Sequence, residues 1–419
     1  MSNLAGKHIV LGITGSIASY KAADIASRLT QAGALVDTCM TPAATRFITP
    51  LAIRALTGRP VYVDMFDPEA ETAEAHVALA RRADAVLVAP ATATTLAHLA
   101  QGSAEDMVAL TVLATRAPVL LAPAMDNQMW ENPATQANVA RLRERGMAFV
   151  GPAVGRLASG HVGAGRLEAP ETILGALRLL LGRNGDLAGR HIVVTAGGTQ
   201  EPIDPVRFIS NHSSGKMGFA VAEAARDRGA RVTLIATPAT AALETPYGVE
   251  RRTVVRTVDM RDAVLAACRQ ADALVMAAAP ADFSPTAAAE HKIKKDGSGR
   301  LVLELEETPD ILRAVQQAGL DVVRVAFAAE TQRVVEYARE KLLRKGVQLV
   351  AANDVTAPGA GFGTDTNLVT LIDAAGTVEA LPLLPKYDVA MRILDRVVAL
   401  LRERDAGSLP APAGAVPEG

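Results

Sequence analysis

The segment ISNHSSGKMG at residues 209–218 has the composition of an anion-binding loop. It combines small polar side chains, two glycines and one lysine directly before a helical apolar pattern. The N–H groups of such a loop and of the first helical turn lack partners, and the helix dipole adds positive potential there. It is not a Walker A loop, because Ser210 replaces the first glycine and Met217 replaces the magnesium-binding hydroxyl. The segment therefore predicts a phosphate site of a different kind.

Length and composition describe a core-rich globular chain that is too long for one ordinary domain. Of its 419 residues, 49% are hydrophobic and 21% are charged, and the formal net charge is −2. A chain this close to neutral gives no reason to expect nucleic acid or an anionic membrane as a partner. We therefore expect two domains that act on small molecules.

Cysteine usage and the N-terminal residues favour a soluble cytoplasmic protein. The two cysteines, Cys39 and Cys268, are not enough for a disulfide framework or a cysteine-based metal site. No other motif in the sequence indicates a metal site. The N-terminal MSNLAGKHIV runs directly into a strand-like pattern. No uncharged apolar stretch reaches the roughly 18 residues that a membrane helix needs.

Strand-like and helical patterns alternate along the chain, which is typical of βαβ units with parallel sheets. The early phrase LAGKHIVLGITG is echoed by LAGRHIVVTAGG from Leu187 onwards, and this echo predicts a second α/β domain. The short polar stretch at residues 182–185 is a plausible linker. The predicted division is a first domain at residues 1–185, a second at 186–404 and a disordered tail at 405–419.

The same patterns predict individual elements. In the first domain the expected strands are 8–13, 35–40, 85–89, 119–122 and 147–150, and the expected helices are 18–31, 94–101 and 138–145. In the second domain the expected strands are 232–236, 274–278, 323–327 and 347–351, and the expected helices are 218–228, 259–269, 334–344 and 387–402. A hairpin is predicted at 368–381 around the turn sequence Asp373–Gly376.

Two doubly wound domains would also suit a nicotinamide dehydrogenase, which needs a glycine-rich turn after a first strand. The turn at residues 12–17 lacks the glycine triplet that lets a pyrophosphate approach the backbone. The turn at residues 196–199 leads to Pro202 and Pro205 instead of a helix. Both turns argue against a dinucleotide site.

Four motifs of the first domain occur in a fixed order: GSIASYK at residues 15–21, PATAT at 90–94, GSAED at 102–106 and PAMDNQMW at 123–130. In this order they resemble the flavin-dependent cysteine decarboxylases. With the second domain, the chain to about residue 402 resembles the bacterial bifunctional phosphopantothenoylcysteine decarboxylase/phosphopantothenate–cysteine ligases of coenzyme A biosynthesis. The resemblance implies two doubly wound Rossmann-like domains, a flavodoxin-like FMN-binding domain followed by a nucleotide-binding ligase domain.

By this resemblance FMN is the cofactor of the first domain, with its phosphate on the first βα turn. The implied FMN-binding residues are Gly15, Ser16, Ile17, Thr41, Phe47, Ala91, Thr92, Ala93 and Met125. Any one of them alone would read as an ordinary loop residue. The prediction depends on the whole set.

Decarboxylation of a cysteine needs an electron sink beside the carboxylate. Flavin can create one by taking hydride from the carbon that bears sulfur, which gives a thioaldehyde from which carbon dioxide leaves readily. The resulting enethiolate must regain hydride and a proton, so the site needs a base, a carboxylate binder and an acid. His76 matches the family's catalytic histidine and is the candidate base.

Two catalytic positions depart from the family's pattern. Asp126 stands where asparagine is usual, and an ionised aspartate would repel the substrate carboxylate. Either burial keeps Asp126 protonated, or it acts through water, or Asn127 supplies the amide. In the segment at 155–166, which resembles the family's mobile flap, Ser159 replaces the usual acid, cysteine. Because a hydroxyl is a weaker acid than a thiol, we hypothesise that His161 provides or relays the proton, with water as the alternative.

Joining a carboxylate to an amine requires an activated carboxylate, and nucleotidyl transfer with loss of pyrophosphate provides one. The leaving pyrophosphate calls for positive charge, which HKIKK at residues 291–295, Lys341 and Lys345 can supply. The resemblance implies CTP, Mg²⁺, an acyl-cytidylate and attack by the amino group of cysteine. It assigns Asn211 to the conversion of the acyl-cytidylate into the amide, and Lys292 to the catalytic loop.

The resemblance also implies a set of CTP-binding residues. They are Ala277, Ala278, Asp282, Lys292, Thr308, Pro309, Asp310, Ile311, Phe327, Lys341 and Lys345. Thr308 stands where asparagine is common, which is a mild change. The residues themselves define neither the metal ligands nor the choice of CTP over ATP.

The leading hypothesis is a bifunctional enzyme that makes 4′-phosphopantetheine from 4′-phosphopantothenate, cysteine and CTP. The family implies a homo-oligomer, with flavin sites between trimer-related decarboxylase domains and with ligase domains paired as dimers. A second hypothesis is that Asp126 and Ser159 leave the first domain as an FMN-binding oligomerisation scaffold around an active ligase. A third is a peptide-cysteine decarboxylase fused to an unrelated nucleotide-binding module, which the Asn211 loop argues against.

Overall fold

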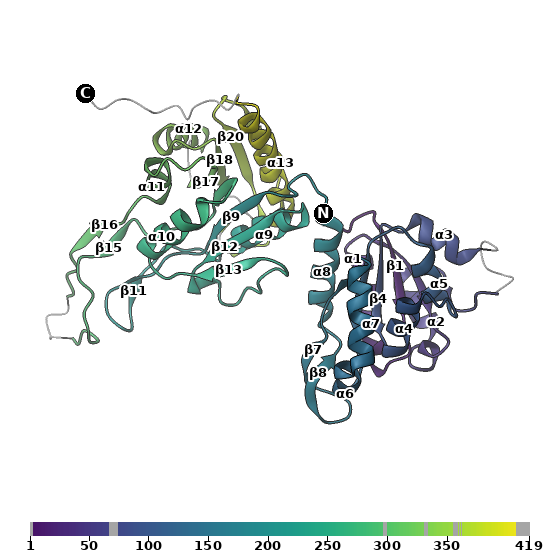
Figure 1. The fold of residues 1–419 in the computed structure, drawn as a ribbon. Helices are drawn as coiled ribbons and strands as arrows, with labels where there is room; N and C mark the ends of the chain where they lie inside the picture. Colours follow the sequence, from purple (N-terminus) through teal and green to yellow (C-terminus); the bar gives the residue numbers. More distant parts are fainter. Residues whose placement is uncertain are drawn as a thin grey trace. The chain divides into compact units, whose positions relative to one another are not determined.

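The computed structural model describes residues 3–66, 74–295, 300–330, 334–354, 359, 361 and 363–407. The chain divides into two compact units, Met1–Gly182 and Arg183–Gly419. Each unit has its own mostly parallel sheet with helices packed on it (Figure 1). The predicted doubly wound α/β architecture is confirmed.

The sheet of unit 1 has six strands in the order β3-β2-β1-β4-β5-β6, all paired in parallel. The strands are β1 His8–Ile13, β2 Leu35–Met40, β3 Val61–Tyr62, β4 Ala85–Ala91, β5 Val119–Pro123 and β6 Ala148–Phe149. With the short edge strand β3 set aside, this is the order of flavodoxin-like sheets. The order reverses between β1 and β4, and ligands of such sheets bind outside the carboxyl ends of the strands at that point.

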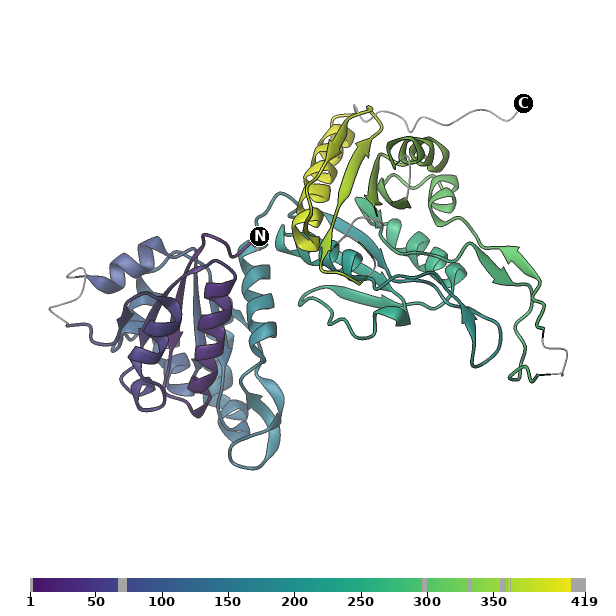
Figure 2. The ribbon, with the colours of Figure 1, turned by 180° about the vertical axis from the view of Figure 1, so that it is seen from behind.

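Helices cover both faces of this sheet, as the opposite views in Figures 1 and 2 show. Ile25 of α1 and Leu177 of α8 belong to the core on one face, and Leu96 of α4 and Val108 of α5 belong to the core on the other. The helices are η1 Ile17–Tyr20, α1 Lys21–Gln31, η2 Ala44–Arg46, α2 Pro50–Thr57, α3 Ala75–Arg82, α4 Ala93–Gln101, α5 Met107–Ala114, α6 Asn127–Glu131, α7 Pro133–Glu144 and α8 Pro170–Gly182.

The sheet of unit 2 has eight strands in the order β13-β12-β9-β14-β17-β18-β20-β21. The pairing is parallel from β13 to β18 and antiparallel for β20 and β21, which form the predicted hairpin. The strands are β9 His191–Ala196, β12 Arg231–Ala236, β13 Glu250–Thr253, β14 Ala273–Met276, β17 Val323–Glu330, β18 Leu349–Asp354, β20 Val369–Asp373 and β21 Val378–Ala380. Here the order reverses between β9 and β14.

Three short antiparallel pairs lie outside this sheet. They are β10 Glu201–Pro202 with β11 Phe208–Ile209, β15 Phe283–Pro285 with β16 Leu305–Glu307, and β19 Thr366–Asn367 with β22 Leu384–Pro385. β15 and β16 belong to an arm that extends from the sheet (Figure 1). The segment after β9 thus enters a hairpin and not a helix, as its prolines predict.

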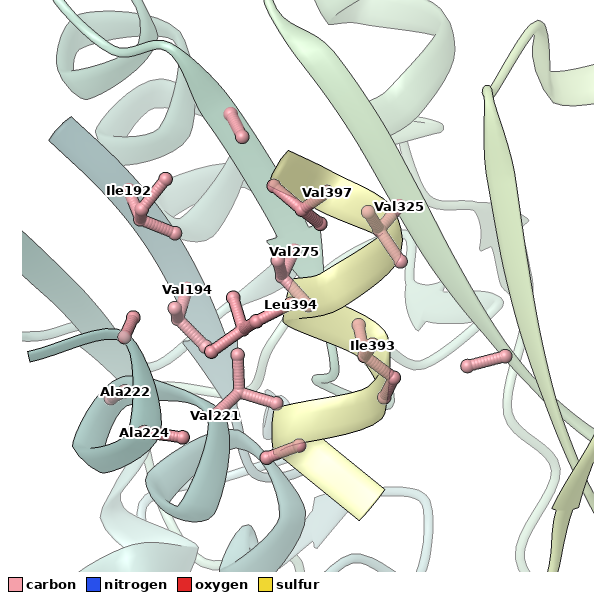
Figure 3. Close-up of a cluster of buried hydrophobic side chains, with 14 of the residues drawn as sticks. Ile192, Val194, Val221, Ala222, Ala224, Val275, Val325, Ile393, Leu394 and Val397 are labelled. Atoms are coloured by element: carbon pink, nitrogen blue, oxygen red, sulfur yellow. The ribbon is translucent and has the colours of Figure 1, made fainter. Parts of the chain in front are cut away.

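Helices α9 and α13 share one core with the sheet of unit 2. Val221 of α9 and Leu394 of α13 meet Val194 and Val275 of the sheet in Figure 3. Other helices pack on the opposite face through Val264 and neighbouring residues. The helices of unit 2 are α9 Lys216–Asp227, η3 Pro238–Thr240, α10 Thr257–Cys268, α11 Ile311–Gln317, α12 Val334–Lys345 and α13 Lys386–Asp405.

The C-terminal end of α13 differs from the predicted tail. Asp405, placed in the tail by the sequence, is the last residue of α13 and forms ion pairs with Arg190 and Arg404. The pair with Arg190 links the final helical turn to the residue that precedes β9. The rest of the predicted tail, from residue 408, lies outside the described residues. None of the described helices is long and apolar enough to cross a membrane.

Candidate active sites

Most of the predicted FMN-binding residues meet at the carboxyl edge of the unit 1 sheet. Gly15 and Ser16 follow β1, Thr41 follows β2, and Thr92 follows β4. The first and third of these turns are joined by Thr14, whose Oγ1 donates to the Pro90 carbonyl at 2.6 Å and accepts from the Thr92 N–H at 3.1 Å. The loops after β1 and β4 are therefore linked at the point where the strand order of the sheet reverses.

The turns at this edge have the geometry of a phosphate cradle. A Cβ atom on Gly15 would lie 2.5 Å from the Cβ of Ala43, so only glycine lets the two loops approach this closely. Ser16 caps η1 by accepting from the Ala18 N–H at 3.2 Å, and Thr92 caps α4 by accepting from the Thr95 N–H at 3.2 Å. Two helix starts thus face the edge, which suits the phosphate of a flavin nucleotide.

The remaining predicted FMN residues lie around these turns. Ile17, in η1, and Phe47, after η2, are exposed, whereas Ala91 is buried at the end of β4 and leads to Ala93 in α4. Met125 follows β5 and is partly buried. Exposed apolar side chains beside a polar turn can contact the flat face of a ring system.

His76 lies in the first turn of α3 and is partly buried. Because α3 leads into β4 of a parallel sheet, its N-terminal turn lies toward the edge where the strands end. The structure therefore places the candidate base on the same side of the sheet as the predicted flavin turns.

The predicted flap is a hairpin formed by β7 Ala153–Arg156 and β8 Val162–Arg166. Its base is fixed to the loop after β5, because the Met125 N–H donates to the Gly165 carbonyl at 2.9 Å. A Cβ atom on Gly165 would lie 2.2 Å from the Met125 carbonyl oxygen, and one on Gly163 would lie 2.8 Å from the Cβ of Asn127. The glycines thus let the flap lie directly against residues 125–127.

The flap brings the two departures from the family pattern into contact. The Ser159 hydroxyl donates to the Asp126 carboxylate at 2.7 Å. Asp126 also caps α6, where its other oxygen accepts from the Gln128 N–H at 3.0 Å. His161 is exposed at the tip of the flap, and its carbonyl accepts from the Leu157 N–H at 2.8 Å.

The alternative that burial keeps Asp126 protonated is wrong. The hydrogen bonds from Ser159 and from the Gln128 N–H hold the pKa of Asp126 below its ordinary value. A helix start favours the charged form of a carboxylate in the same way. Asp126 is therefore ionised at neutral pH, and the alternatives that remain are action through water and an amide supplied by Asn127.

In unit 2 a cavity of about 660 Å³ opens toward the carboxyl ends of β14, β17 and β18. It brings together the predicted ligase residues Asn211, Ala277, Ala278, Asp282, Thr308, Pro309, Asp310, Ile311, Phe327, Lys341 and Lys345. The cavity thus lies beside the reversal of strand order between β9 and β14, where doubly wound sheets bind ligands.

One wall of the cavity is formed by Asn211 and residues 213–215 of the loop between β11 and α9. The Asn211 side-chain amide donates to the Pro280 carbonyl at 2.8 Å, which ties this loop to the segment after β14. A Cβ atom on Gly198 would lie 2.5 Å from the Asn211 carbonyl oxygen, and one on Gly218 would lie 2.6 Å from the Thr195 carbonyl oxygen. These glycines let the loop and α9 approach the end of β9 closely.

The opposite wall carries the predicted nucleotide lysines. Lys341 donates to the Phe327 carbonyl at 2.6 Å, and Lys345 forms an ion pair with Asp310. The hydroxyl of Thr308 donates to the Ala281 carbonyl at 2.6 Å. Both lysines therefore project from α12 toward strand and loop residues that line the cavity.

Lys292 is the predicted ligase residue that the structure does not bring to the cavity wall. It is exposed and is not among the lining residues. The reason is the neighbouring backbone: the Ile293 N–H donates to Asp204 at 3.1 Å, and Arg207 donates to the Ile293 carbonyl at 3.1 Å. The segment is thus docked on the β10–β11 hairpin.

The cavity wall also contains residues outside the predicted set of catalytic and nucleotide-binding residues. Among them are Lys216, which the sequence placed only in the general anion-binding motif, and Asn367 and Lys386. The sequence held one indication for Lys386. This lysine follows Pro385 at the start of a helix, where the helix dipole disfavours positive charge, so its position suggests a functional reason.

Comparison with known families agrees with this geometry. Residues 1–181 match the model of the Flavoprotein family, and residues 187–401 match that of the DNA/pantothenate metabolism flavoprotein C-terminal domain. The fold and the two sites thus define a two-unit flavoprotein of pantothenate metabolism.

Named relatives make the assignment more specific. The chain is 44% identical over 403 residues to the coenzyme A biosynthesis bifunctional protein CoaBC of Bacillus subtilis strain 168, covering 96% of this chain and 98% of the relative. The solved C-terminal domain of a CoaBC protein is 38% identical, with a TM-score of 0.45, and covers 52% of this chain and 99% of that one. The FMN-dependent cysteine decarboxylase SpaF is 32% identical, with a TM-score of 0.36, and covers 42% and 99%.

The chain belongs to the CoaBC family of bifunctional coenzyme A biosynthesis proteins. It is an enzyme with a flavoprotein decarboxylase half and a ligase half, as the sequence predicts.

Proposed function

We propose that the chain makes 4′-phosphopantetheine in two reactions. Unit 2 joins 4′-phosphopantothenate to cysteine at the expense of CTP, and unit 1 then decarboxylates the product with FMN. The observation that carries this proposal is the cavity of unit 2, whose walls combine Asn211 with the lysines of α12. That combination suits a carboxylate that is first activated and then attacked by an amine.

The ligase residues suit two successive displacements. A carboxylate oxygen of phosphopantothenate attacks the α-phosphorus of CTP and pyrophosphate leaves, which the ammonium groups of Lys341 and Lys345 favour by stabilising its charge. The cysteine nitrogen then attacks the acyl carbon, loses a proton and expels CMP. Asn211 donates one of its two side-chain amide hydrogens to the Pro280 carbonyl. Its other hydrogen is available to polarise the acyl carbonyl.

We propose that Mg²⁺ acts together with the nucleotide phosphates. Within the described part of the chain there is no group of three or more His, Cys, Asp or Glu residues that could hold a metal ion. Mg²⁺ in nucleotide sites commonly binds one or two carboxylates together with substrate phosphates and water. Asp282 lines the cavity and is the candidate protein ligand.

In unit 1, FMN would take hydride from the carbon that bears sulfur and return it after carbon dioxide has left. We propose that Gly15, Ser16 and Thr92 hold its phosphate, and that His76 takes the substrate proton. Because Asp126 is ionised, the amide of Asn127 is the better candidate to bind the substrate carboxylate. His161 at the flap tip would supply the final proton.

Exposed apolar residues support the proposed assembly. In unit 1, Ile17, Tyr20, Phe47 and Leu51 are exposed, two of them among the predicted FMN residues. In unit 2, exposed apolar residues occur on and beside the short hairpins: Val206, Phe208, Phe283 and Leu305. Clustered exposed apolar surface marks interaction sites. We propose trimer-based contacts for unit 1 and pairing of the unit 2 hairpins.

We propose the cytoplasm as the place of action. The state of both cysteines is compatible with a reducing compartment, because Cys39 and Cys268 are free thiols in the interior.

The experiment that tests the function is an assay of the purified protein with 4′-phosphopantothenate, cysteine and CTP, in which pyrophosphate and carbon dioxide are both followed. We expect both products and a flavin absorbance spectrum. Pyrophosphate without carbon dioxide would support the scaffold alternative for unit 1, and the absence of both would overturn the proposal. Replacing CTP with ATP tests the choice of nucleotide.

Two variants separate the reactions. Asn211→Ala should abolish amide formation while supplied phosphopantothenoylcysteine is still decarboxylated. His76→Ala should do the reverse. If either variant lost both activities with its fold intact, the division of labour between the units would be wrong.

A further inference from the structure

Two lysines in the ligase cavity wall have no role in the reaction described above. Lys216 is the first residue of α9 and Lys386 is the first residue of α13, and both line the cavity. The two helices pack side by side on the sheet through one core that includes Val221 and Leu394 (Figure 3). The shared core therefore holds both lysines at fixed places in the wall.

Lys386 is in a place that is unfavourable for an ammonium group. It is only 8% exposed, and it lies at a helix start, where the dipole disfavours positive charge. Burial, and then the charge of Lys216, lower the pKa of Lys386, while Asp365 opposes this. A buried ammonium persists only where good acceptors compensate for the lost water.

The acceptors of Lys386 all belong to one short segment. Its ammonium donates to the Thr364 carbonyl, to the Thr366 carbonyl at 2.9 Å and to the Thr364 hydroxyl at 3.4 Å. Its backbone N–H donates to the Asp365 carbonyl at 3.0 Å. Lys386 thus fixes the backbone on both sides of Asp365.

The side chain of Asp365 connects this segment to Lys216. Its carboxylate accepts from the Lys216 ammonium at 2.7 Å, and the same ammonium donates to the Gly363 carbonyl at 2.7 Å. The Asp365 side chain is 90% exposed, so its ion pair with Lys216 is weak in water. These two contacts use two of the three ammonium hydrogens of Lys216, and the third can be donated to a phosphate group.

We propose that Lys386 is a positioning residue of the ligase site: it fixes residues 364–366 so that Asp365 and Gly363 hold the Lys216 ammonium at the cavity wall, ready for a substrate phosphate. The substrate group is a phosphate ester or polyphosphate, borne by CTP or by phosphopantothenate. This inference rests on the ligase activity proposed for unit 2. Lys386 itself contacts backbone and hydroxyl oxygens and acts through Lys216.

The test is a double-mutant cycle on ligase kinetics with Lys216→Met and Lys386→Met. We expect Lys386→Met to raise the KM for CTP or for phosphopantothenate by about ten-fold, with a smaller change in kcat, because uniform binding is lost. In the Lys216→Met background the same change should have less than about a two-fold effect, since coupled residues are non-additive. Lys386→Arg, which keeps the charge, should restore part of the affinity.

Controls separate this role from general support of the fold. Arg392→Met removes a cation from an exposed part of the same helix and should leave both KM values unchanged. Decarboxylation of supplied phosphopantothenoylcysteine by unit 1 should be unchanged in every variant. If Lys386→Met does not fold, Asp365→Asn replaces it in the cycle, because that side chain is exposed and its loss does not threaten the core.

Unchanged KM values in Lys386→Met, or equal effects in the presence and absence of Lys216, would overturn the proposal. The same holds for Asp365→Asn where it stands in for Lys386→Met. Failure of the proposed function is distinguishable, because the unmodified protein would then release no pyrophosphate.

Discussion

The Ser159 hydroxyl donates a 2.7 Å hydrogen bond to the carboxylate of Asp126, 33 residues earlier in the chain. Ser159 lies in the turn of the β7–β8 hairpin, and Asp126 caps α6 after β5. Both residues depart from the pattern of the flavin-dependent decarboxylases, in which asparagine and cysteine are usual. The bond links these two departures and holds the flap against the site.

Replacement of Asp126 by asparagine should improve substrate binding in unit 1. The change removes a negative charge that repels the substrate carboxylate, and two charges about 4 Å apart in water interact by about 1 kcal/mol. We expect the KM for phosphopantothenoylcysteine to fall roughly five-fold. Carbon dioxide release measures this, with Glu131→Gln on α6 as the control. A higher KM would mean that Asp126 contributes to binding.

Replacement of His161 by asparagine should stall the second half of the decarboxylation. Without the proposed proton donor, substrate would still reduce the flavin, whereas return of hydride to the product would slow by about 10² to 10⁴. Stopped-flow absorbance should show bleaching of the flavin without recovery. Arg156→Gln on the flap is the control. Normal turnover would indicate that water supplies the proton.

Replacement of Gly15 by alanine should impair decarboxylation, and replacement of Gly198 by alanine should impair ligation. A Cβ atom would lie 2.5 Å from Ala43 at the first position and 2.5 Å from the Asn211 carbonyl oxygen at the second. Gly15→Ala should therefore lower FMN occupancy and carbon dioxide release, and Gly198→Ala should lower CTP-dependent ligation and pyrophosphate release by displacing Asn211. Each variant is the other's control, and loss of the opposite activity would contradict the assignment of the sites.

The two cysteines should not react with thiol reagents in the native protein. Burial raises the pKa of Cys39 and of Cys268 to about 12, against about 8.5 for a free thiol. At pH 8 neither residue holds an appreciable fraction of thiolate. Labelling with a maleimide should require denaturant. Rapid labelling of the folded protein would contradict the buried placement.

The same shifts predict how stability changes with pH. Above about pH 8.5 the unfolded chain loses thiol protons that the native protein keeps, so the free energy of unfolding falls as pH rises. For each thiol the slope approaches about 1.4 kcal/mol per pH unit as the thiol of the unfolded chain becomes fully ionised. Urea unfolding between pH 8 and 10 measures this slope, and it should become smaller in Cys39→Ser.

Replacement of Asp37 by alanine should destabilise unit 1 strongly. Its fully buried carboxylate lies 2.8 Å from the Nε of Arg59 and 2.8 Å from the Nε of Arg82. Removing the shared acid takes one ion-pair partner from each of the two guanidinium groups, at a cost of about 3–5 kcal/mol in the free energy of unfolding. Asp24→Ala breaks the exposed pair with Arg28 and should cost less than about 1 kcal/mol. Equal losses in urea unfolding would contradict this.

Short apolar strands and amphipathic helices could be predicted from the sequence, whereas a uniformly apolar helix could not. Strand β2 has the predicted bounds Leu35–Met40, and α9 begins two residues before its predicted start at residue 218. Helix α5, with the sequence MVALTVLA, was not predicted, because an almost wholly apolar run has no polar face to give a helical period. Its place in the core could be read only from the packing.

Sequence patterns were sufficient to predict the two α/β domains, the motifs of the family and most of the residues that meet at each site. Periodic patterns and turn residues act locally, so one stretch of chain is enough to read them. Which distant residues are in contact, and how those contacts shift pKa values, could be seen only in the folded structure. Lys216 contacts Asp365 across 149 residues, and the pKa of Asp126 is lowered because the flap brings the Ser159 hydroxyl to it. Such contacts and pKa values depend on donors from distant segments, whose positions are set by packing of the whole unit.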